Sequence, residues 1–204
     1  MKKKLIIFDL DGVLINSKYN MEVSWNSLNT KYNLGINFKK YFKFIGMPFE
    51  EILKKLNINK NYSIYKKHYD FVSKKNIKLI KLYPGVKKTL KILKKKKIKI
   101  AIVTSKDFNR TKKILKIKLN SINFDLVNSP VKKFRSKPHP DLILNTISRL
   151  NVDPSESLYC GDMNYDLQTA KRAGIMFVLA KYGYSSNLKT NHKIKKFSNI
   201  LKYT

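Results

Sequence analysis

Between residues 83 and 182 the sequence alternates helical segments with short apolar segments, and this alternation constrains the fold more than any other feature. We expect helices at about 86–96, 109–119, 140–150 and 165–173, and strands at 98–104, 124–127, 157–160 and 176–180. Alternating helices and strands with short connections predict a doubly wound α/β fold, in which a parallel sheet is covered on both faces. Ligands of such sheets bind outside the carboxyl ends of the strands. The polar residues that directly follow each strand are therefore the candidates for a functional site.

Another apolar segment lies near the start of the chain, and it ends abruptly in two carboxylates. Leu5–Phe8 is followed by "DLDG", which places Asp9 and Asp11 two residues apart, just before Gly12. A short continuous apolar run is typical of a buried strand, and an unpaired charge beside a core is costly. One interpretation is a strand that ends at the surface, where Asp-Gly marks a turn. The other is a site that needs both acids.

Further polar residues are placed where the same sheet edge would collect them. They are Thr104 and Ser105 after the strand 98–104, Asp162 and Asp166 after the strand 157–160, and Lys137 in the loop "FRSKPHPD". Each has an ordinary alternative: Thr104 could cap a helix, Asp166 could favour a helix start, and Lys137 is one lysine among many. Taken together, however, the four aspartates are a large share of the 13 acidic residues. Four carboxylates at one edge indicate a bound cation.

The stretch from 16 to 82 has a different rhythm, with helical spacing and no convincing strand. We expect three helices there, which carry the apolar sets Met21, Trp25, Leu28 and Tyr32; Phe49, Ile52, Leu53 and Leu56; and Tyr65, Tyr69 and Val72. These patterns predict an α/β core of residues 1–15 and 83–204, with a small helical segment of residues 16–82 inserted after the first strand. From residue 183 onward we expect a turn and a short amphipathic helix.

The formal net charge of +31 raises the possibility of nucleic-acid binding. Only four of the 44 basic residues are arginines, whereas recognition of bases and phosphates relies heavily on arginine. The lysines are also spread along the whole chain, so we expect no specific nucleic-acid partner. No stretch has the ~18 to 20 consecutive apolar residues of a membrane span, and no signal-peptide core is present. A single cysteine, Cys160, leaves no internal disulfide framework. A soluble cytoplasmic protein, monomeric or weakly dimeric, is expected.

Four segments together resemble the motifs of the haloacid dehalogenase-like hydrolase superfamily. They are "FDLDGVLINS" at 8–17, "VTS" at 103–105, "KPHPD" at 137–141 and "GDMNYDLQTAKRAG" at 161–174. The resemblance covers residues 4 to about 16 and 83 to about 182. It is most similar to the branch of phosphoglycolate phosphatases and β-phosphoglucomutases, whose members carry a small helical cap after the first strand. The segment "IGMPFEEIL" is similar to a cap segment of these relatives. The resemblance thus implies that residues 16–82 are the small helical cap and that residues 1–15 and 83–204 are the catalytic core.

The resemblance implies a role for each carboxylate. Asp9 would be the nucleophile, which attacks phosphorus to give an aspartyl-phosphate. The carboxylates of Asp9 and Asp162, with the backbone carbonyl of Asp11, would bind Mg²⁺, an ion that prefers oxygen ligands. Asp11 would also be the general acid and base, which protonates the leaving alkoxide and then deprotonates water. Asp166 would act from behind by orienting a metal-bound water or Lys137.

The remaining candidates would bind the substrate. Lys137 would neutralise the nucleophile and a phosphoryl oxygen. Thr104 and Ser105 would bind the phosphate, and Gly12 would let the backbone approach it closely. In the cap, Lys43 beside "FIGMP" is a weak candidate for a contact with the rest of the substrate.

The function hypothesis is a Mg²⁺-dependent phosphatase that hydrolyses a small phosphorylated metabolite of the phosphoglycolate or sugar phosphate type. One alternative is a phosphomutase of the β-phosphoglucomutase type, which would share every core motif. An alternative from a different class is a non-catalytic basic binding protein on the same fold. The sequence does not distinguish the substrate, because specificity in such enzymes depends on cap residues.

Overall fold

The chain divides into two compact units. The computed structural model describes residues 2–185 and 188–204. One unit comprises Met1–Asn16 and Leu82–Thr204, which we call the core, and the other comprises Ser17–Lys81, which we call the cap. Each unit is described in turn.

The core is built on six parallel strands in the order β5-β4-β1-β6-β7-β8. Their bounds are β1 Leu5–Phe8, β4 Lys99–Val103, β5 Leu126–Asn128, β6 Ser157–Gly161, β7 Met176–Ala180 and β8 Lys193–Ile194. The first strand of the chain thus lies in the middle, paired with β4 on one side and β6 on the other. This sheet confirms the predicted α/β fold class. It also brings the carboxyl ends of β4, β1 and β6 side by side.

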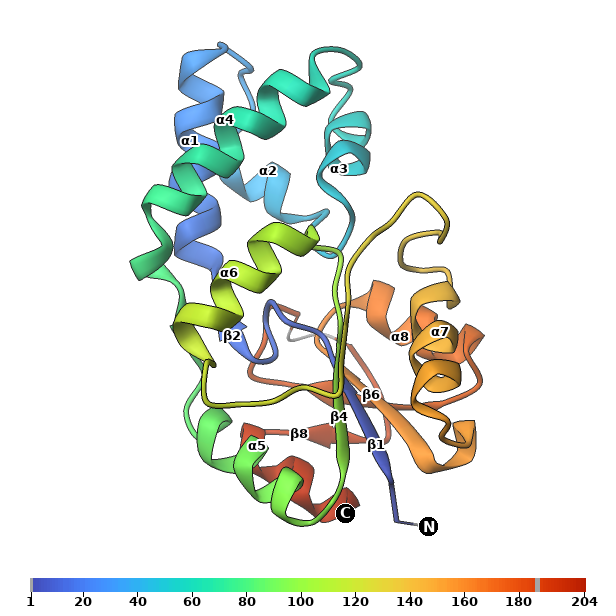
Figure 1. Cartoon of the computed structure of the whole chain (residues 1–204). Helices are drawn as coiled ribbons and strands as arrows, with labels where there is room; N and C mark the ends of the chain where they lie inside the picture. The colour runs from blue at the N-terminus through green and yellow to red at the C-terminus, as the bar shows by residue number, and fades with distance from the viewer. Residues whose placement is uncertain (1, 186–187) are drawn as a thin grey trace. The chain divides into compact units, whose positions relative to one another are not determined.

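Helices cover both faces of this sheet (Figure 1). They are α5 Val86–Lys95, α6 Phe108–Lys118, α7 Asp141–Leu150 and α8 Asn164–Arg172, with short 3-10 helices η2 Pro154–Glu156 and η3 Phe197–Tyr203. Along β1, Leu5 and Ile7 belong to the apolar cluster that includes α7 and α8 residues. Phe8 points to the other face, where its ring lies 5.4 Å from that of Phe197 in η3. Because both faces are covered, β1 is apolar without interruption, as buried parallel strands are.

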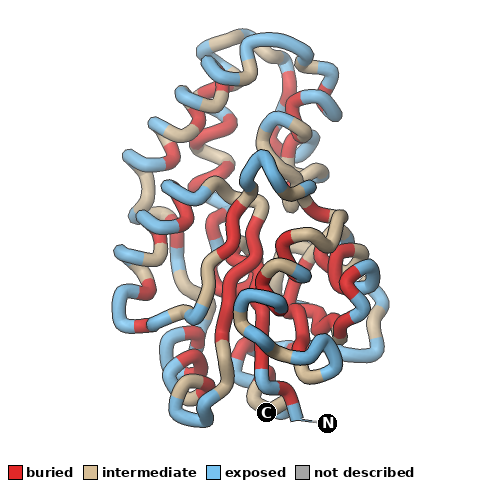
Figure 2. The backbone as a smooth tube through the Cα atoms, turned by 45° about the vertical axis from the view of Figure 1, so that its right-hand side comes forward, coloured by how far each residue is buried: buried red, intermediate tan, exposed pale blue. Residues whose placement is uncertain are grey.

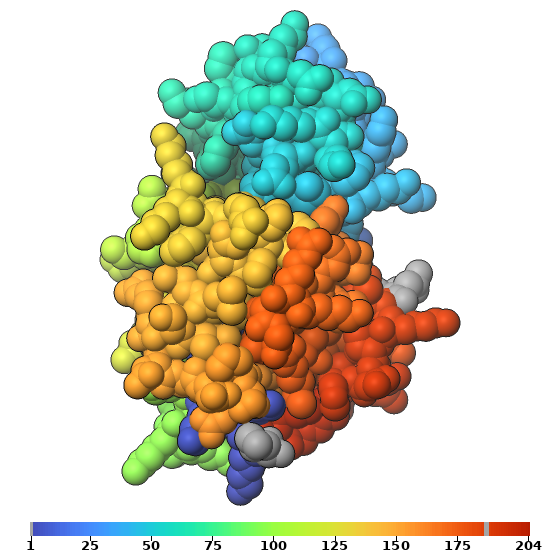
Figure 3. Space-filling model, turned by 90° about the vertical axis from the view of Figure 1, so that its right-hand side faces the viewer, coloured from blue at the N-terminus to red at the C-terminus, as the bar shows by residue number. Residues whose placement is uncertain are grey.

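The burial pattern follows this layering. Figure 2 shows buried residues running along the central strands, with exposed residues on the outer sides of the helices. The segments coloured yellow to orange, which include α7 and α8, lie side by side on the core surface in Figure 3. Both termini lie at one end of the core, where the Lys3 amide donates to the Tyr203 carbonyl at 3.1 Å (Figure 1). Among the described residues no helix is long and apolar enough to cross a membrane.

The cap is an all-helical unit. Its elements are α1 Lys18–Lys31, α2 Phe38–Phe42, α3 Phe49–Lys55, α4 Tyr62–Lys75 and the 3-10 helix η1 Ile77–Leu79. Its centre is Trp25, which is fully buried, stacks on Tyr41 with ring centroids 4.1 Å apart, and donates to the Ile36 carbonyl at 2.8 Å. The buried Asn20 of α1 exchanges hydrogen bonds with Ser73 of α4, which fixes the register of these two helices.

The sequence-based prediction missed α2, β2, β3 and β8. The five-residue α2 is too short to show a period. The ladder of β2 (Ile15–Asn16) with β3 (Lys81–Leu82) has two residues on each strand, at the points where the chain leaves and re-enters the core. In the tail, where we expected a turn and an amphipathic helix, the described residues form β8 and η3. The expectation was wrong for β8, because two residues next to five other strands carry no alternation of their own.

Candidate active site

Three neighbouring strands deliver the predicted acids to one edge of the sheet. Asp9 follows β1 directly, and its amide donates to the Cys160 carbonyl of β6 at 2.9 Å. Asp162 follows β6, and Thr104 follows β4. Asp9, Asp162 and Thr104 are all buried. Since parallel strands end at the same edge, residues far apart in the sequence meet here.

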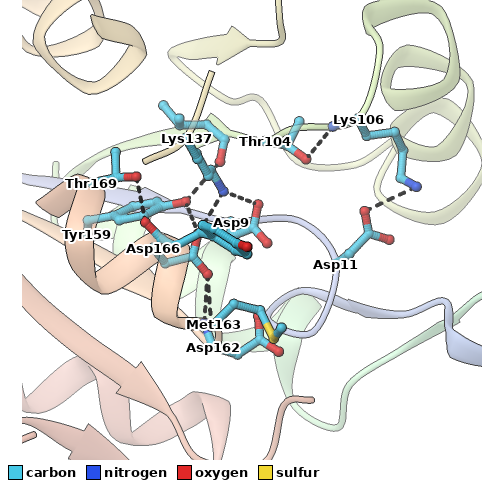
Figure 4. Close-up of polar contacts among 12 residues, drawn as sticks. Asp9, Asp11, Thr104, Lys106, Lys137, Tyr159, Asp162, Met163, Asp166 and Thr169 are labelled. Carbon is cyan, nitrogen blue, oxygen red and sulfur yellow. Dashed lines mark hydrogen bonds and ion pairs between the residues drawn. The ribbon is translucent and has the colours of Figure 1, made fainter. Parts of the chain in front are cut away.

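Lys137 lies at the centre of this group (Figure 4). Its ammonium donates to Asp9 Oδ1 and to Asp166 Oδ1, each at 2.8 Å, and its side chain is only 2 % exposed. The hydroxyl of Tyr159, on β6, donates to the same Asp166 oxygen at 2.9 Å. One buried cation therefore joins the residue after β1 to the residue on α8, across the sheet edge.

Asp166 uses its second oxygen to hold the loop that precedes α8. Its Oδ2 accepts hydrogen bonds from the amides of Asp162 at 3.1 Å and Met163 at 3.0 Å. It therefore satisfies amides at the start of the helix, as a helix-start carboxylate does. Asp166 therefore contacts both the amides at the start of α8 and the ammonium of Lys137. With both oxygens already engaged, Asp166 is the least available of the buried acids for a further ligand.

Asp162 has the opposite character. Its Oδ2 accepts a 2.6 Å hydrogen bond from the Tyr184 amide, whereas its Oδ1 is buried and finds no hydrogen-bond partner among the described residues. A buried carboxylate oxygen without a partner is costly. Oxygens of Asp9, Asp162 and Asp166 lie within 4.8 Å of one another. Oxygen ligands in a close group, one of them with no other partner, fit a hard divalent cation such as Mg²⁺.

Two glycines leave the space that the Asp162 carboxylate occupies. A Cβ on Gly12 would lie 2.1 Å from Asp162 Oδ2, and a Cβ on Gly183 would lie 2.4 Å from Asp162 Cβ and 2.6 Å from the Gly12 carbonyl oxygen. Gly12 also has a φ of +83°, which side-chain-bearing residues rarely adopt. Glycine at position 12 thus leaves room for the Asp162 carboxylate and also permits the backbone conformation of its own turn.

The crowding of charge shifts the protonation equilibria. Burial raises the pKa of Asp9 to about 7, against the Lys137 ammonium, which lowers it. Burial, with the charges of Asp166 and Asp9, raises the pKa of Asp162 well above its ordinary range. Burial alone would lower the pKa of Lys137, but the two carboxylates that it contacts outweigh this and raise it. Lys137 is therefore charged, but its single positive charge does not balance the carboxylates around it.

Asp11 lies on the other side of this group. Its Oδ2 is 3.1 Å from the ammonium of Lys106, in the loop after β4 (Figure 4). The amide of Lys106 donates to Thr104 Oγ1 at 3.2 Å. The pKa of Lys106 is lowered by burial, with Asp11 opposing that shift. Thr104 does not cap α6, because Asp107 does so by accepting from the Arg110 amide.

The last two predicted residues, Ser105 and Lys43, lie in different units of the chain. Ser105 follows Thr104 at the same edge and is half-buried, whereas Lys43 ends α2 in the cap and is exposed. Sequence reasoning missed Lys106, Tyr159 and Tyr184. Lys106 was one lysine among many, Tyr159 was interpreted as strand core, and Tyr184 contacts Asp162 through its backbone amide, which no sequence pattern marks.

Comparison with known proteins decides the family. Residues 6–180 match the haloacid dehalogenase-like hydrolase family. The chain belongs to this family. A phosphoglycolate phosphatase from Aquifex aeolicus is 32 % identical over 204 residues, which cover 96 % of this chain and 91 % of the relative. The pyrophosphatase PpaX from Bacillus mycoides is 28 % identical over 207 residues, with 98 % and 96 % covered.

A solved structure gives the same answer for the fold. That of a predicted phosphoglycolate phosphatase from Haemophilus somnus superimposes with a TM-score of 0.85 at 27 % identity, covering 99 % of this chain and 98 % of the other. The family hypothesis is confirmed, and so is the prediction that this haloacid dehalogenase-like hydrolase is a phosphatase.

Proposed function

We propose that this phosphatase depends on Mg²⁺ and hydrolyses a small phosphorylated metabolite through an aspartyl-phosphate on Asp9. One observation carries the proposal: the Asp9 carboxylate is fixed by the Lys137 ammonium beside Asp162, whose buried Oδ1 has no partner among the described residues. A nucleophilic carboxylate held by an ammonium, next to a carboxylate oxygen that could bind a metal ion, is suited to attack on a phosphate. Asp9 and Asp162 would hold the Mg²⁺, together with the Asp11 backbone carbonyl.

The main obstacle to this reaction is electrostatic. A singly charged carboxylate about 3.5 Å from a doubly charged phosphate is repelled by about 9 kcal/mol at an effective dielectric constant of ~20. Lys137 is placed to offset part of this, because its ammonium touches the attacking carboxylate. When bound, Mg²⁺ would withdraw charge from the phosphoryl oxygens. Thr104, Ser105 and the backbone at Gly12 would bind the remaining phosphoryl oxygens.

The chain's own residues then account for two displacements. In the first, Asp9 bonds to phosphorus, the bond to the leaving oxygen breaks, and that oxygen takes a proton from Asp11. In the second, water attacks the phosphorus, gives its proton to Asp11, and releases phosphate and the Asp9 carboxylate. Asp166 would keep Lys137 aimed at Asp9 during both steps.

For the substrate we propose an ester of the phosphoglycolate or sugar phosphate type. Two relatives described above are named as a phosphoglycolate phosphatase and a pyrophosphatase, so phosphoglycolate and pyrophosphate are the first compounds to test. The cap, with the exposed Lys43 at the end of α2, is the proposed source of specificity.

The test is a screen of phosphorylated metabolites with release of inorganic phosphate as the readout. Wild type should release phosphate with Mg²⁺ and stop with EDTA. Asp9→Asn should be inactive yet fold normally, and the matched control Asp153→Asn, on an exposed turn, should keep full activity. Acid quenching during turnover of ³²P-labelled substrate should leave label on the wild-type protein and none on Asp9→Asn. Turnover by Asp9→Asn at the wild-type rate would refute the aspartyl-phosphate.

A phosphomutase requires a separate control, because it would also phosphorylate Asp9. Hexose 1-phosphate with a trace of the bisphosphate can be followed by phosphorus NMR. Hydrolysis predicts free phosphate. Hexose 6-phosphate that accumulates without free phosphate would overturn the assignment to hydrolysis.

A further inference from the structure

Lys106 is a buried lysine to which no role has been given so far. Its side chain is 6 % exposed, and its ammonium lies 3.1 Å from Asp11 Oδ2, on an Asp11 side chain that is 12 % exposed. Figure 4 shows the Asp11 carboxylate turned toward Lys106, whereas Asp9 is turned toward Lys137. Two lysines thus hold the two acids of the "DLDG" turn apart.

The backbone on both sides of this ion pair is fixed. The Lys106 amide donates to Thr104 Oγ1 at 3.2 Å, and its carbonyl accepts from Thr111 Oγ1 at 3.4 Å. Opposite it, the Gly12 amide closes the turn after Asp11 by donating to the Ile15 carbonyl at 2.8 Å. Because these hydrogen bonds fix the backbone near both residues, the ion pair restricts the rotation of the Asp11 side chain.

The separation has a chemical use. In phosphoryl transfer the attacking and leaving oxygens lie roughly in line on opposite sides of phosphorus. An acid that serves the leaving oxygen must therefore be kept away from the nucleophile, although it is only two residues further along the chain. Without the Lys106 ammonium, the Asp11 side chain would lose the ion pair that holds it on the side away from Asp9.

We propose that Lys106 is a positioning residue that aims Asp11 at the leaving group of the substrate. This inference rests on the function proposed above. Lys106 takes no part in the bond changes: Asp11 receives a proton from the attacking water of one turnover and gives it to the leaving oxygen of the next. The ion pair sets where this transfer can occur.

The experiment compares two leaving groups in a double-mutant cycle. Phosphoglycolate has an alkoxide leaving group, which needs a proton, whereas p-nitrophenyl phosphate has one that departs without it. Wild type, Lys106→Met, Asp11→Asn and the double variant are measured on both, with Mg²⁺. If phosphoglycolate is not a substrate, the alkyl phosphate hydrolysed fastest in the screen replaces it. Lys112→Met, an exposed lysine on α6, is the matched control, and melting curves check the fold.

Lys106→Met should lower kcat on the alkyl phosphate about tenfold or more and change p-nitrophenyl phosphate turnover by less than about threefold, since general acid catalysis contributes about 10² to 10⁴. KM should change little, and Lys106→Arg should restore most of the rate. In the Asp11→Asn background, Lys106→Met should have no further effect on the ratio of the two rates.

Three results would overturn the inference. Equal losses on both substrates would mean a general structural role. A raised KM with unchanged kcat would mean that Lys106 binds the substrate itself. Losses that multiply in the double variant would mean that Lys106 acts independently of Asp11. If wild type hydrolyses no phosphate ester at all, the proposed function fails first, and the inference fails with it.

Discussion

Replacing Gly183 with alanine should damage the proposed metal site although no proposed ligand is replaced. The new Cβ would lie 2.4 Å from Asp162 Cβ, 2.6 Å from Asp162 Oδ2 and 2.6 Å from the Gly12 carbonyl oxygen. Contacts this short cannot persist, and one of the neighbours is backbone in a tight turn. The loop that carries Gly183 must therefore move away from Asp162, together with the Tyr184 amide that holds Asp162 Oδ2 at 2.6 Å.

The size of the effect follows from these two losses. Overpacking costs about 1 to 3 kcal/mol, and a hydrogen bond to a charged group contributes about 1.5 to 3 kcal/mol. Because the loop relieves part of the clash by breaking the bond, we expect about 2 to 4 kcal/mol in total. In a chain of this length that lowers Tm by about 4 to 16 °C. Loss of the group that orients a ligand weakens metal binding by about 10- to 100-fold.

Calorimetric titration of Mg²⁺ and thermal melting together test this reasoning. The matched control is Gly174→Ala, where a Cβ meets no atom within 4 Å but φ is +68°. That variant should lose about 1 to 2 kcal/mol of stability from its backbone conformation and bind Mg²⁺ normally. If Gly183→Ala binds Mg²⁺ as tightly as Gly174→Ala does, then Asp162 is not positioned by the loop at Gly183, and the argument fails.

Three further predictions concern the same protein. Saturating Mg²⁺, at about 100 times its Kd, should stabilise the fold by about 2.7 kcal/mol and raise Tm by about 5 to 11 °C; Ca²⁺ should inhibit, because it tolerates irregular coordination, and identical melting in Mg²⁺ and EDTA would contradict the metal site. Lys137→Met should lower the free energy of unfolding by about 3 to 5 kcal/mol, because the buried carboxylates of Asp9 and Asp166 lose the ammonium that both contact; chemical denaturation measures this loss, and a loss below about 1 kcal/mol would contradict it. His68 should titrate below 6.5 by NMR, because burial and the charge of Lys31 lower its pKa; protonation then favours the unfolded chain, so its contribution to stability is present above the unfolded pKa of about 6.5 and is lost as the pH falls, whereas a titration above 6.5 would contradict the burial argument.

The fold class could be predicted because buried parallel strands have a recognisable sequence pattern. The core strand β1 is a continuous apolar run, and alternation of such runs with helices leaves few other topologies. The missed elements are those whose cause lies elsewhere in the chain. Lys193–Ile194 becomes a strand only because β7 offers a free edge, and the five residues of α2 are helical largely because Phe38 and Tyr41 pack in the cap.

The candidate site divides in the same way. Asp9, Asp162 and Thr104 could be placed together from topology, because each directly follows a strand. Lys106 could not, since nothing in a lysine-rich sequence separates a buried lysine from an exposed one. Nor could the pairing of Gly183 with Asp162 be foreseen, because it depends on a loop after β7 folding back to β6. The alternation of strands and helices along the chain predicts that these strand ends share one edge of the sheet. It does not predict which loops cover that edge.

The central position of β1 in the sheet also affects how the protein folds during its synthesis. Leu5 is synthesised well before its ladder partners, Lys99 and Ser157. A ribosome adding about 5 to 20 residues per second needs about 8 to 30 s to reach the second of them. During that time β1 is an apolar segment with an open edge, of the kind that aggregates or engages chaperones. Because Asp9 is joined to β6 by its amide, the nucleophile reaches its place only when β6 arrives. The nascent chain therefore completes its reactive centre only after β6 has been synthesised.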